Sequence, residues 1–301
     1  MTKAVFTTRV SPSYDDLPEL YYHFPKQYLK RVEETVGDWI VYYEPSRTGG
    51  GSSRREGRKV YFATAKITGV RNDPDRPGHY YADIAEYLEF DNPVPFRLEN
   101  RFFESSLRRK DGETATGVFQ NAVRRISDEE FDGISKAGFA VALRPQEHSD
   151  HHALSLREEP AVFDRPIVER LVKRPFRDAA FTENVRSAYD ATCAFTGLRL
   201  INGGGRCEIE AAHIRPVGDG HNGPDSVRNG IALSRTIHWM FDRGHLALTD
   251  SHEILIAEKY VPESVRGFIR PNRKIILPAD AIEHPHKSFL AYHREHIFKG
   301  N

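Results

Sequence analysis

Cysteine is almost missing from this 301-residue sequence, in which Cys193 and Cys207 are the only two. Two cysteines are too few for a disulfide framework. They also exclude a zinc knuckle built from two CxxC pairs, since the first candidate pair reads CAFT at 193–196 and lacks one ligand. We interpret both cysteines as small buried residues.

The sequence also lacks an excess of charge of either sign, because Lys and Arg together number 43, as do Asp and Glu. No global basic charge indicates non-specific wrapping of nucleic acid, so a binding surface for it would have to come from local clustering. Long hydrophobic runs are absent as well: the opening MTKAVFTTRV has no run of signal length, and no segment approaches a membrane span. We therefore expect a cytoplasmic protein without a membrane partner, and its length suffices for about two domains.

The stretch 193–244 has the most informative pattern in the chain. CEIEAAHI at 207–214 is short and half apolar, which predicts a strand, and IAL at 231–233 predicts a second strand after an Asn-Gly turn. Ser234 then stands at the N-cap of a helix, and Gly244 stands where a glycine ends one. The apolar stripe of this helix consists of Ile237, Met240 and Phe241. The sequence thus predicts a β-hairpin that leads into a short helix.

Four polar residues of this stretch have side chains suited to phosphodiester hydrolysis. His213 on the first strand would face His238 and Asp242, which lie one helical turn apart. A neutral imidazole can take a proton from water near pH 7, and an imidazole beside a carboxylate can hold a hard divalent cation. Asn229, beside the hairpin turn, can fix the loop that carries the base. A lone histidine or a His/Asp helix pair is commonly structural, but the order and spacing of the three elements favour a hydrolytic site.

The motifs AAHI, RNGIAL and HWMFDRG follow one another in this order, with CAFTG upstream. Together they resemble the HNH nucleases of the ββα-metal class, and the resemblance covers about residues 175–300. It implies that His213 is the general base, that Asn229 is the orienting catalytic residue, and that His238 is both a catalytic residue and a metal ligand. It further implies that Asp242 is the second ligand, and that the cofactor is a divalent ion, Mg²⁺ or Mn²⁺.

The chain departs from the HNH pattern at one position. Many members carry an Asp or His ligand immediately before the base, and this sequence has Ala212 there. Glu210 lies on the same side of the predicted strand and is a candidate substitute. A DNA-binding protein with an inactive nuclease fold is the alternative that Ala212 leaves open.

The first 142 residues consist mostly of predicted strands with about two helices. GDWIVYYEP is followed by YFATAKITGV, an aromatic strand and PVPF, an order that resembles the PUA-like superfamily with its EVE and SRA domains. The resemblance implies a small β-barrel that holds a flipped, modified base in an aromatic cage. The candidates for this cage are Tyr21, Tyr22, Trp39, Tyr43 and Tyr81. The alternative is that these side chains only pack, because strands are rich in aromatic residues for that reason alone.

Two polar segments separate the predicted elements. The Gly/Ser/Arg-rich loop near residues 48–59 either tracks phosphates or is simply solvated. Its cations are Arg47, Arg54, Arg55, Arg58 and Lys59. Residues 143–160 predict a linker, although they contain His148, His151 and His152, which could bind metal adventitiously.

The predicted architecture is therefore α+β, with an N-terminal PUA-like β-barrel at 1–142, a linker at 143–160 and a C-terminal ββα-metal HNH domain at 161–301. The two resemblances together imply a modification-dependent DNA endonuclease that recognises modified cytosine in double-stranded DNA and has a role in defence. A homodimer that cuts both strands is compatible with the sequence. The alternative within enzymes is an HNH nicking or structure-specific nuclease whose N-terminal domain recognises something else.

Overall fold

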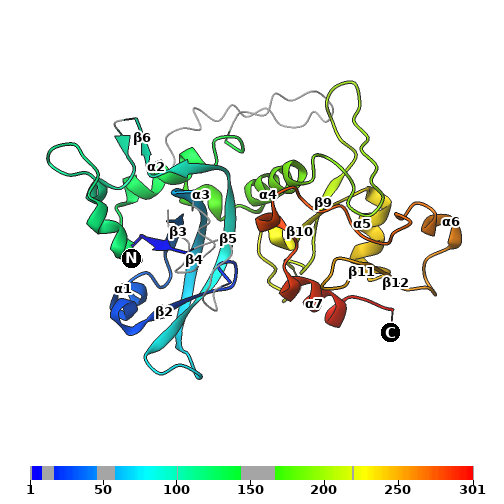
Figure 1. Cartoon of the computed structure of the whole chain (residues 1–301), viewed down its shortest axis with the longest axis horizontal. Helices are drawn as coiled ribbons and strands as arrows, with labels where there is room; N and C mark the ends of the chain where they lie inside the picture. The colour runs from blue at the N-terminus through cyan, green and yellow to red at the C-terminus, as the bar shows by residue number, and fades with distance from the viewer. Residues whose placement is uncertain are drawn as a thin grey trace, which may run out of the picture. The chain divides into compact units, whose positions relative to one another are not determined.

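The computed structural model describes residues 2–8, 17–45, 58–99, 101–143, 167–218 and 220–300. The chain forms two compact units (Figure 1). Unit 1 comprises Met1–Glu86 and Phe90–Arg177, and unit 2 comprises Tyr87–Glu89 and Asp178–Asn301. Both units mix helices with strands, so the α+β class holds in this coarse form. No helix in the described part of the chain is long and apolar enough to span a membrane.

Unit 1 is built on one six-stranded sheet with the order β2-β5-β4-β3-β1-β8. Its strands are β1 (Ala4–Thr7), β2 (Tyr21–Pro25), β3 (Trp39–Glu44), β4 (Val60–Asn72), β5 (His79–Pro95) and β8 (Val123–Arg125). A two-stranded ribbon pairs β6 (Arg97–Leu98) with β7 (Arg101–Phe102). The helices are η1 (Lys26–Tyr28), α1 (Leu29–Glu33), η2 (Ser105–Leu107), η3 (Thr116–Gln120), α2 (Asp128–Gly138) and α3 (Val168–Leu171), where η marks a 3₁₀ helix.

The large sheet curls into a half-barrel among the described residues, and the PUA-like β-barrel stays a prediction. Strands β2 and β8 form its two edges, and no pairing joins them among the residues that the structure describes. Strand β1 lies parallel to β3 and antiparallel to β8. Strand β5 is also longer than predicted, because it continues through the prolines of DNPVP to Pro95. Proline is tolerated in a strand where its missing N–H is not needed for pairing, and Val94 between the two prolines is buried.

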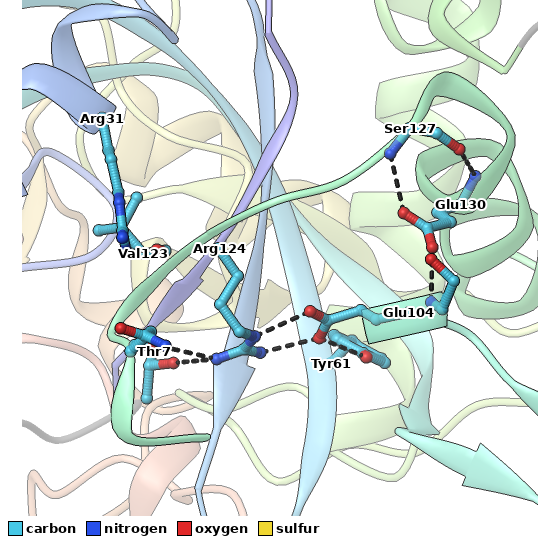
Figure 2. Close-up of polar contacts among 10 residues, drawn as sticks. Thr7, Arg31, Tyr61, Glu104, Val123, Arg124, Ser127 and Glu130 are labelled. Carbon is cyan, nitrogen blue, oxygen red and sulfur yellow. Dashed lines mark hydrogen bonds and ion pairs between the residues drawn. The ribbon is translucent and has the colours of Figure 1, made fainter. Parts of the chain in front are cut away.

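Helix α2 begins at a capping box formed by Ser127 and Glu130. The Ser127 hydroxyl accepts a hydrogen bond from the Glu130 N–H at 3.2 Å, and the Glu130 carboxylate accepts one from the Ser127 N–H at 2.8 Å (Figure 2). The helix buries Phe131 and Ile134. At its end, a Cβ on Gly138 would lie 2.4 Å from the Phe90 ring, so the close packing of α2 on β5 requires glycine here.

A buried ion pair lies inside unit 1. The Arg124 guanidinium on β8 donates two hydrogen bonds to the Glu104 carboxylate, both at 2.8 Å (Figure 2). Tyr61 on β4 donates a third bond to this carboxylate at 2.7 Å, and Arg124 also donates to the Thr7 hydroxyl at 2.9 Å. Burial and the Glu104 charge raise the pKa of Tyr61. The network joins four separate segments of the chain, and its hydrogen-bonding groups are paired, which makes a buried charge tolerable.

In its described residues unit 2 contains four α-helices and two small two-stranded sheets, along with shorter 3₁₀ turns. Its elements are α4 (Arg174–Ala188, which begins in unit 1), β9 (Glu210–His213), η4 (Val227–Asn229), β10 (Gly230–Leu233), α5 (Arg235–Asp242), β11 (Leu246–Leu248), β12 (Ile254–Ile256), α6 (Glu263–Arg266), η5 (Ala281–Glu283) and α7 (Lys287–His296). After Gly244 the chain forms the antiparallel pair of β11 and β12 and ends with helix α7. Cys193 is buried and Cys207 is partly exposed, and both are free thiols.

Candidate active site

The site is built on the hairpin of β9 and β10 and on the helix α5 that follows. The strands are antiparallel, with His213 opposite Gly230 and Glu210 opposite Leu233. Helix α5 packs on both strands through the predicted apolar stripe of Ile237, Met240 and Phe241, which is buried. Gly244 ends the helix at φ +69°, and a Cβ there would lie 1.9 Å from the Ile297 carbonyl oxygen. Only glycine meets both demands, as the sequence predicts.

His213 lies at the end of β9 between an aromatic ring and a carboxylate. Its Nε2 lies 2.8 Å from Asp225 Oδ1, and the Asp225 side chain is completely buried. The imidazole stacks on the Phe181 ring of α4 with 3.8 Å between ring centres and an angle of 10°. A carboxylate accepts hydrogen bonds and does not donate them, so the proton of the neutral imidazole belongs on Nε2 and the lone pair on Nδ1. The sequence analysis did not identify Asp225 as the partner of His213.

Asn229 is fully buried and holds both ends of the loop that follows His213. Its Oδ1 accepts a hydrogen bond from the Arg215 N–H at 2.8 Å. Its Nδ2 donates to the Arg215 carbonyl at 3.0 Å and to the Pro224 carbonyl at 2.9 Å. The side chain therefore ties residues 215 and 224 together, directly before Asp225. This geometry matches the loop-fixing position foreseen for Asn229, whose catalytic role stays a prediction.

The structure brings His238 and Asp242 together with Glu210. His238 Nδ1 lies 2.9 Å from Glu210 Oε2, and His238 Nε2 lies 3.3 Å from Asp242 Oδ2. Arg235 contacts the other Glu210 oxygen at 3.1 Å. Burial raises the pKa of Asp242, and the nearby positive groups, of which His213 is one, oppose this rise. The base candidate and the carboxylate cluster thus lie close enough to interact.

The donors of this cluster suit a divalent ion chemically, because two carboxylates and one imidazole are ligands that Mg²⁺ and Mn²⁺ accept. As the side chains stand, however, His238 bridges the two carboxylates through both ring nitrogens. Across the described ranges, no group of three or more His, Cys, Asp or Glu side chains is arranged to hold a metal ion. Binding would therefore require His238 to exchange at least one carboxylate partner for the ion.

The five aromatic residues proposed for a base cage do not form one cage. Tyr21 and Tyr81 touch edge to face with ring centres 5.4 Å apart. Tyr22 packs at 4.9 Å from Phe6 on the other face of β2, while Trp39 and Tyr43 are buried in β3. Of the five, only Tyr21 has a side chain that is more than slightly exposed.

The predicted cationic loop is described only at its end. Arg58 forms an ion pair with Glu44 at 2.6 Å, and Lys59 has φ +56°. Arg47, Arg54 and Arg55 lie outside the described residues, as do His148, His151 and His152 of the predicted linker.

Comparison with known proteins identifies the second unit. Residues 193–249 match the HNH_2 family, described as HNH endonuclease. The chain therefore contains an HNH endonuclease domain, and the prediction of a nuclease is confirmed. Domains of this family generally use a divalent metal ion. No curated protein sequence shows a significant match to the chain.

Three solved structures show partial likeness to the chain. The modification-dependent TagI restriction endonuclease is 16% identical over 97% of this chain and 81% of its own, with a TM-score of 0.33. The N-terminal domain of Staphylothermus marinus McrB is 12% identical over 45% of this chain and 94% of its own, with a TM-score of 0.30. The type IV phosphorothioation-dependent restriction endonuclease ScoMcrA is 12% identical over 79% of this chain and 48% of its own, with a TM-score of 0.19. Since these TM-scores are low, we argue function from the residues of the site.

Proposed function

We propose that this chain is a modification-dependent DNA endonuclease, in which the HNH domain of unit 2 hydrolyses double-stranded DNA and unit 1 recognises a modified cytosine. The observation that carries the hydrolytic role is the pair of His213 and Asp225 beside the cluster of Glu210, His238 and Asp242. The proposal for unit 1 is supported by the sequence resemblance of residues 1–142 to PUA-like domains.

In the proposed mechanism His213 is the general base. Its Nε2–H donates to the buried Asp225 carboxylate, and Nδ1 has no hydrogen-bond partner within the described residues. Nδ1 takes a proton from water, and the water oxygen attacks phosphorus in line. The bond from phosphorus to the 3′ oxygen breaks, and this oxygen keeps the bonding electrons and takes a proton from solvent. Asp225 then stabilises the imidazolium, in the way that a buried carboxylate orients a catalytic histidine. Phe181 fixes the orientation of the His213 ring by stacking on it. Asn229 holds the loop that brings Asp225 to His213.

The metal ligands that we propose are His238 and Asp242, with Glu210 in place of the ligand missing at Ala212. The side chain of Ala212 is a buried methyl group, so it has no atom that could bind a metal ion. Glu210 lies two residues earlier on the same side of β9 and already reaches His238. A bound divalent ion would supply a Lewis acid that stabilises negative charge on the phosphate oxygens.

Cleavage of matched plasmids tests the proposed function. The plasmids carry cytosine, 5-methylcytosine, 5-hydroxymethylcytosine or its glucosylated form, and the reactions contain Mg²⁺ or Mn²⁺. We expect the wild-type chain to cut at least one modified plasmid much faster than the plain one. His213→Ala should lower the rate by at least about 100-fold, because general bases contribute that much.

Other outcomes of this assay select the alternatives. Equal cutting of all four plasmids would mean that unit 1 does not read cytosine modification, and single-strand cuts alone would indicate a nicking enzyme. Binding without cleavage under any metal condition would indicate an inactive nuclease fold.

A further inference from the structure

Unit 1 contains a basic pocket that the sequence analysis did not identify. The pocket has a volume of about 520 Å³. It is lined by Arg101, Phe102, Ser105, Arg108, Arg109 and Lys110. Four of these six residues are cationic and none is acidic, in a chain whose total charge is balanced. Two of its lining residues belong to β7 and one begins η2, so the pocket lies beside the β6–β7 ribbon.

The cations of the pocket are available to a ligand. Arg101, Arg108, Arg109 and Lys110 are all exposed. Arg109 has an exposed partner, Asp111, at 3.0 Å. Within the part of the chain that the structure describes, the side chains of Arg108 and Lys110 have no ion-pair or hydrogen-bond partner. Cations that lie close together repel one another where no acidic partner offsets their charge, as at Arg108 and Lys110, and a polyanion removes this repulsion.

The backbone beneath these cations is held firmly by the interior of unit 1. Leu107 is fully buried, and the neighbouring Glu104 takes part in the buried ion pair with Arg124 (Figure 2). The Ser105 N–H donates to the Glu130 carboxylate of the α2 capping box at 2.6 Å. A site on a fixed backbone loses less entropy when it binds, so this placement favours a binding surface over a merely solvated loop.

The walls of the pocket suit a phosphodiester strand. Guanidinium groups match phosphate oxygens in geometry, and the Ser105 hydroxyl offers a further polar contact. Phe102 is half-buried with the Arg97 guanidinium over its ring at 5.0 Å, so it presents an apolar edge next to the charges. Contacts of this kind position a protein on DNA without reading its sequence.

We propose that this pocket binds the phosphate backbone of the DNA substrate and that Arg108 and Lys110 each neutralise a phosphate. The proposal rests on the proposed function for its ligand and adds the surface that holds it. Backbone contacts release counterions, so they weaken with salt in a predictable way, whereas contacts that read a modified base do not.

The test measures duplex binding by the full chain in EDTA, by fluorescence anisotropy across a salt series. Arg108→Ala combined with Lys110→Ala should raise Kd roughly 10- to 100-fold at 0.1 M salt. It should also flatten the slope of log Kobs against log salt concentration by about 2, because each phosphate contact contributes about 0.9. The preference for modified over plain DNA should stay unchanged, as these residues touch no base. The matched control is Lys26→Ala with Lys30→Ala, which removes two exposed cations of the same unit and should leave slope and Kd unchanged.

The proposal would be overturned if the Arg108/Lys110 variant kept the wild-type salt slope. It would also be overturned if the Lys26/Lys30 control lost as much DNA affinity as that variant. A changed preference for modified DNA would mean that the pocket reads bases. Displacement of DNA by millimolar inorganic phosphate would assign the pocket to a small anion instead. If the wild-type chain cuts modified plasmids and the variant binds normally, the proposed function stands and the pocket assignment fails. If the wild-type chain neither binds nor cuts DNA, both fail.

Discussion

His213 has two ring nitrogens, and Asp225 decides which of them can accept a proton. The carboxylate fixes the Nε2–H tautomer at 2.8 Å, while Phe181 stacks on the ring. Asp225 is therefore a positioning residue, because it acts on the substrate only through the imidazole of His213.

Asp225→Asn should lower the cleavage rate at least about tenfold, since the amide can donate a proton to Nε2 and turn the imidazole into the wrong tautomer. DNA affinity measured in EDTA should stay near wild type, because Asp225 lies away from solvent. The control is Glu295→Gln, an exposed acid of the same unit, which should cut normally. Normal cleavage by Asp225→Asn would show that its bond to His213 has no role in the reaction.

Glu210→Gln should weaken Mn²⁺ binding roughly tenfold or more, because the amide keeps the shape of the side chain but removes the charge that the ion prefers. Isothermal titration calorimetry without DNA gives this affinity directly. Asp242→Asn should have an effect of similar size, and Glu208→Gln serves as the control on the same segment. Wild-type affinity in Glu210→Gln, together with a loss in Asp242→Asn, would leave the ion with His238 and Asp242 alone.

The residues of the site were predictable to different degrees. His213, Asn229, His238 and Asp242 follow from motif order, and Glu210 follows from the alternation of side chains along a strand. Asp225 was not predictable, because an acid in a loop of Gly, Asn and Pro has no periodicity that shows where it points. Only the folded loop, tied by Asn229, brings it to the base.

Among the helices and strands, the sequence predicted best the features that depend on neighbouring residues. The start of α2 follows from its capping box, and the end of α5 follows from Gly244. The Asn-Gly turn predicted before β10 did not form, because Asn229 ends a 3₁₀ helix and Gly230 is extended at φ −112°. The aromatic cage did not form as predicted, and the reason is visible in β2. Tyr21 and Tyr22 are adjacent in a strand, so their side chains point to opposite faces of the sheet. The edges of a sheet depend on long-range pairing, so local sequence patterns could not decide whether this sheet closes into a barrel.

Removal of one partner from the buried ion pair of Arg124 with Glu104 should strongly destabilise unit 1. Arg124→Met leaves a buried, unpaired carboxylate and should lower the free energy of unfolding by about 3–5 kcal/mol. The next residue provides the control, because Arg125 pairs with Glu34 at the surface, where such pairs contribute about 0–1 kcal/mol. Urea unfolding followed by circular dichroism measures both variants. If both variants lost a similar free energy of unfolding, burial would not determine how much an ion pair contributes to stability.

Helix α7 should make unit 2 sensitive to acid. His293 is buried against the Phe241 ring, and this burial lowers its pKa from 6.5 to about 4. The unfolded chain therefore takes up a proton that the folded chain resists, so stability is full above about pH 6.5 and falls as the pH drops towards 4. The loss from this group amounts to about 3 kcal/mol.

His293→Phe keeps the ring but cannot titrate, so thermal unfolding should depend less on pH between 6.5 and 4 in this variant. His286, whose pKa burial also lowers to about 4, should preserve part of the dependence. An unchanged pH profile in His293→Phe would show that acid sensitivity arises elsewhere.

At the level of the whole molecule, the proposal assigns recognition and chemistry to different units. The two units have separate cores and the match to the HNH family lies entirely within unit 2. A chain without net charge gains little affinity for DNA from its overall field. Affinity must then come from local surfaces such as the basic pocket, and specificity from a site that distinguishes one base from another.

Discrimination and cleavage should therefore be separable by single substitutions in the full chain. His213→Ala should bind modified DNA over plain DNA with the wild-type ratio of Kd values, measured by anisotropy, although it no longer cuts. Tyr21→Ala should keep cleaving DNA but lose much of the preference for modified DNA. Tyr21 is the partly exposed member of the predicted cage, and the loss of one stacking contact lowers the ratio roughly tenfold while plain-DNA cleavage continues. Loss of the ratio in His213→Ala would place recognition within the HNH domain, whose loop between His213 and Asn229 would then be the reader.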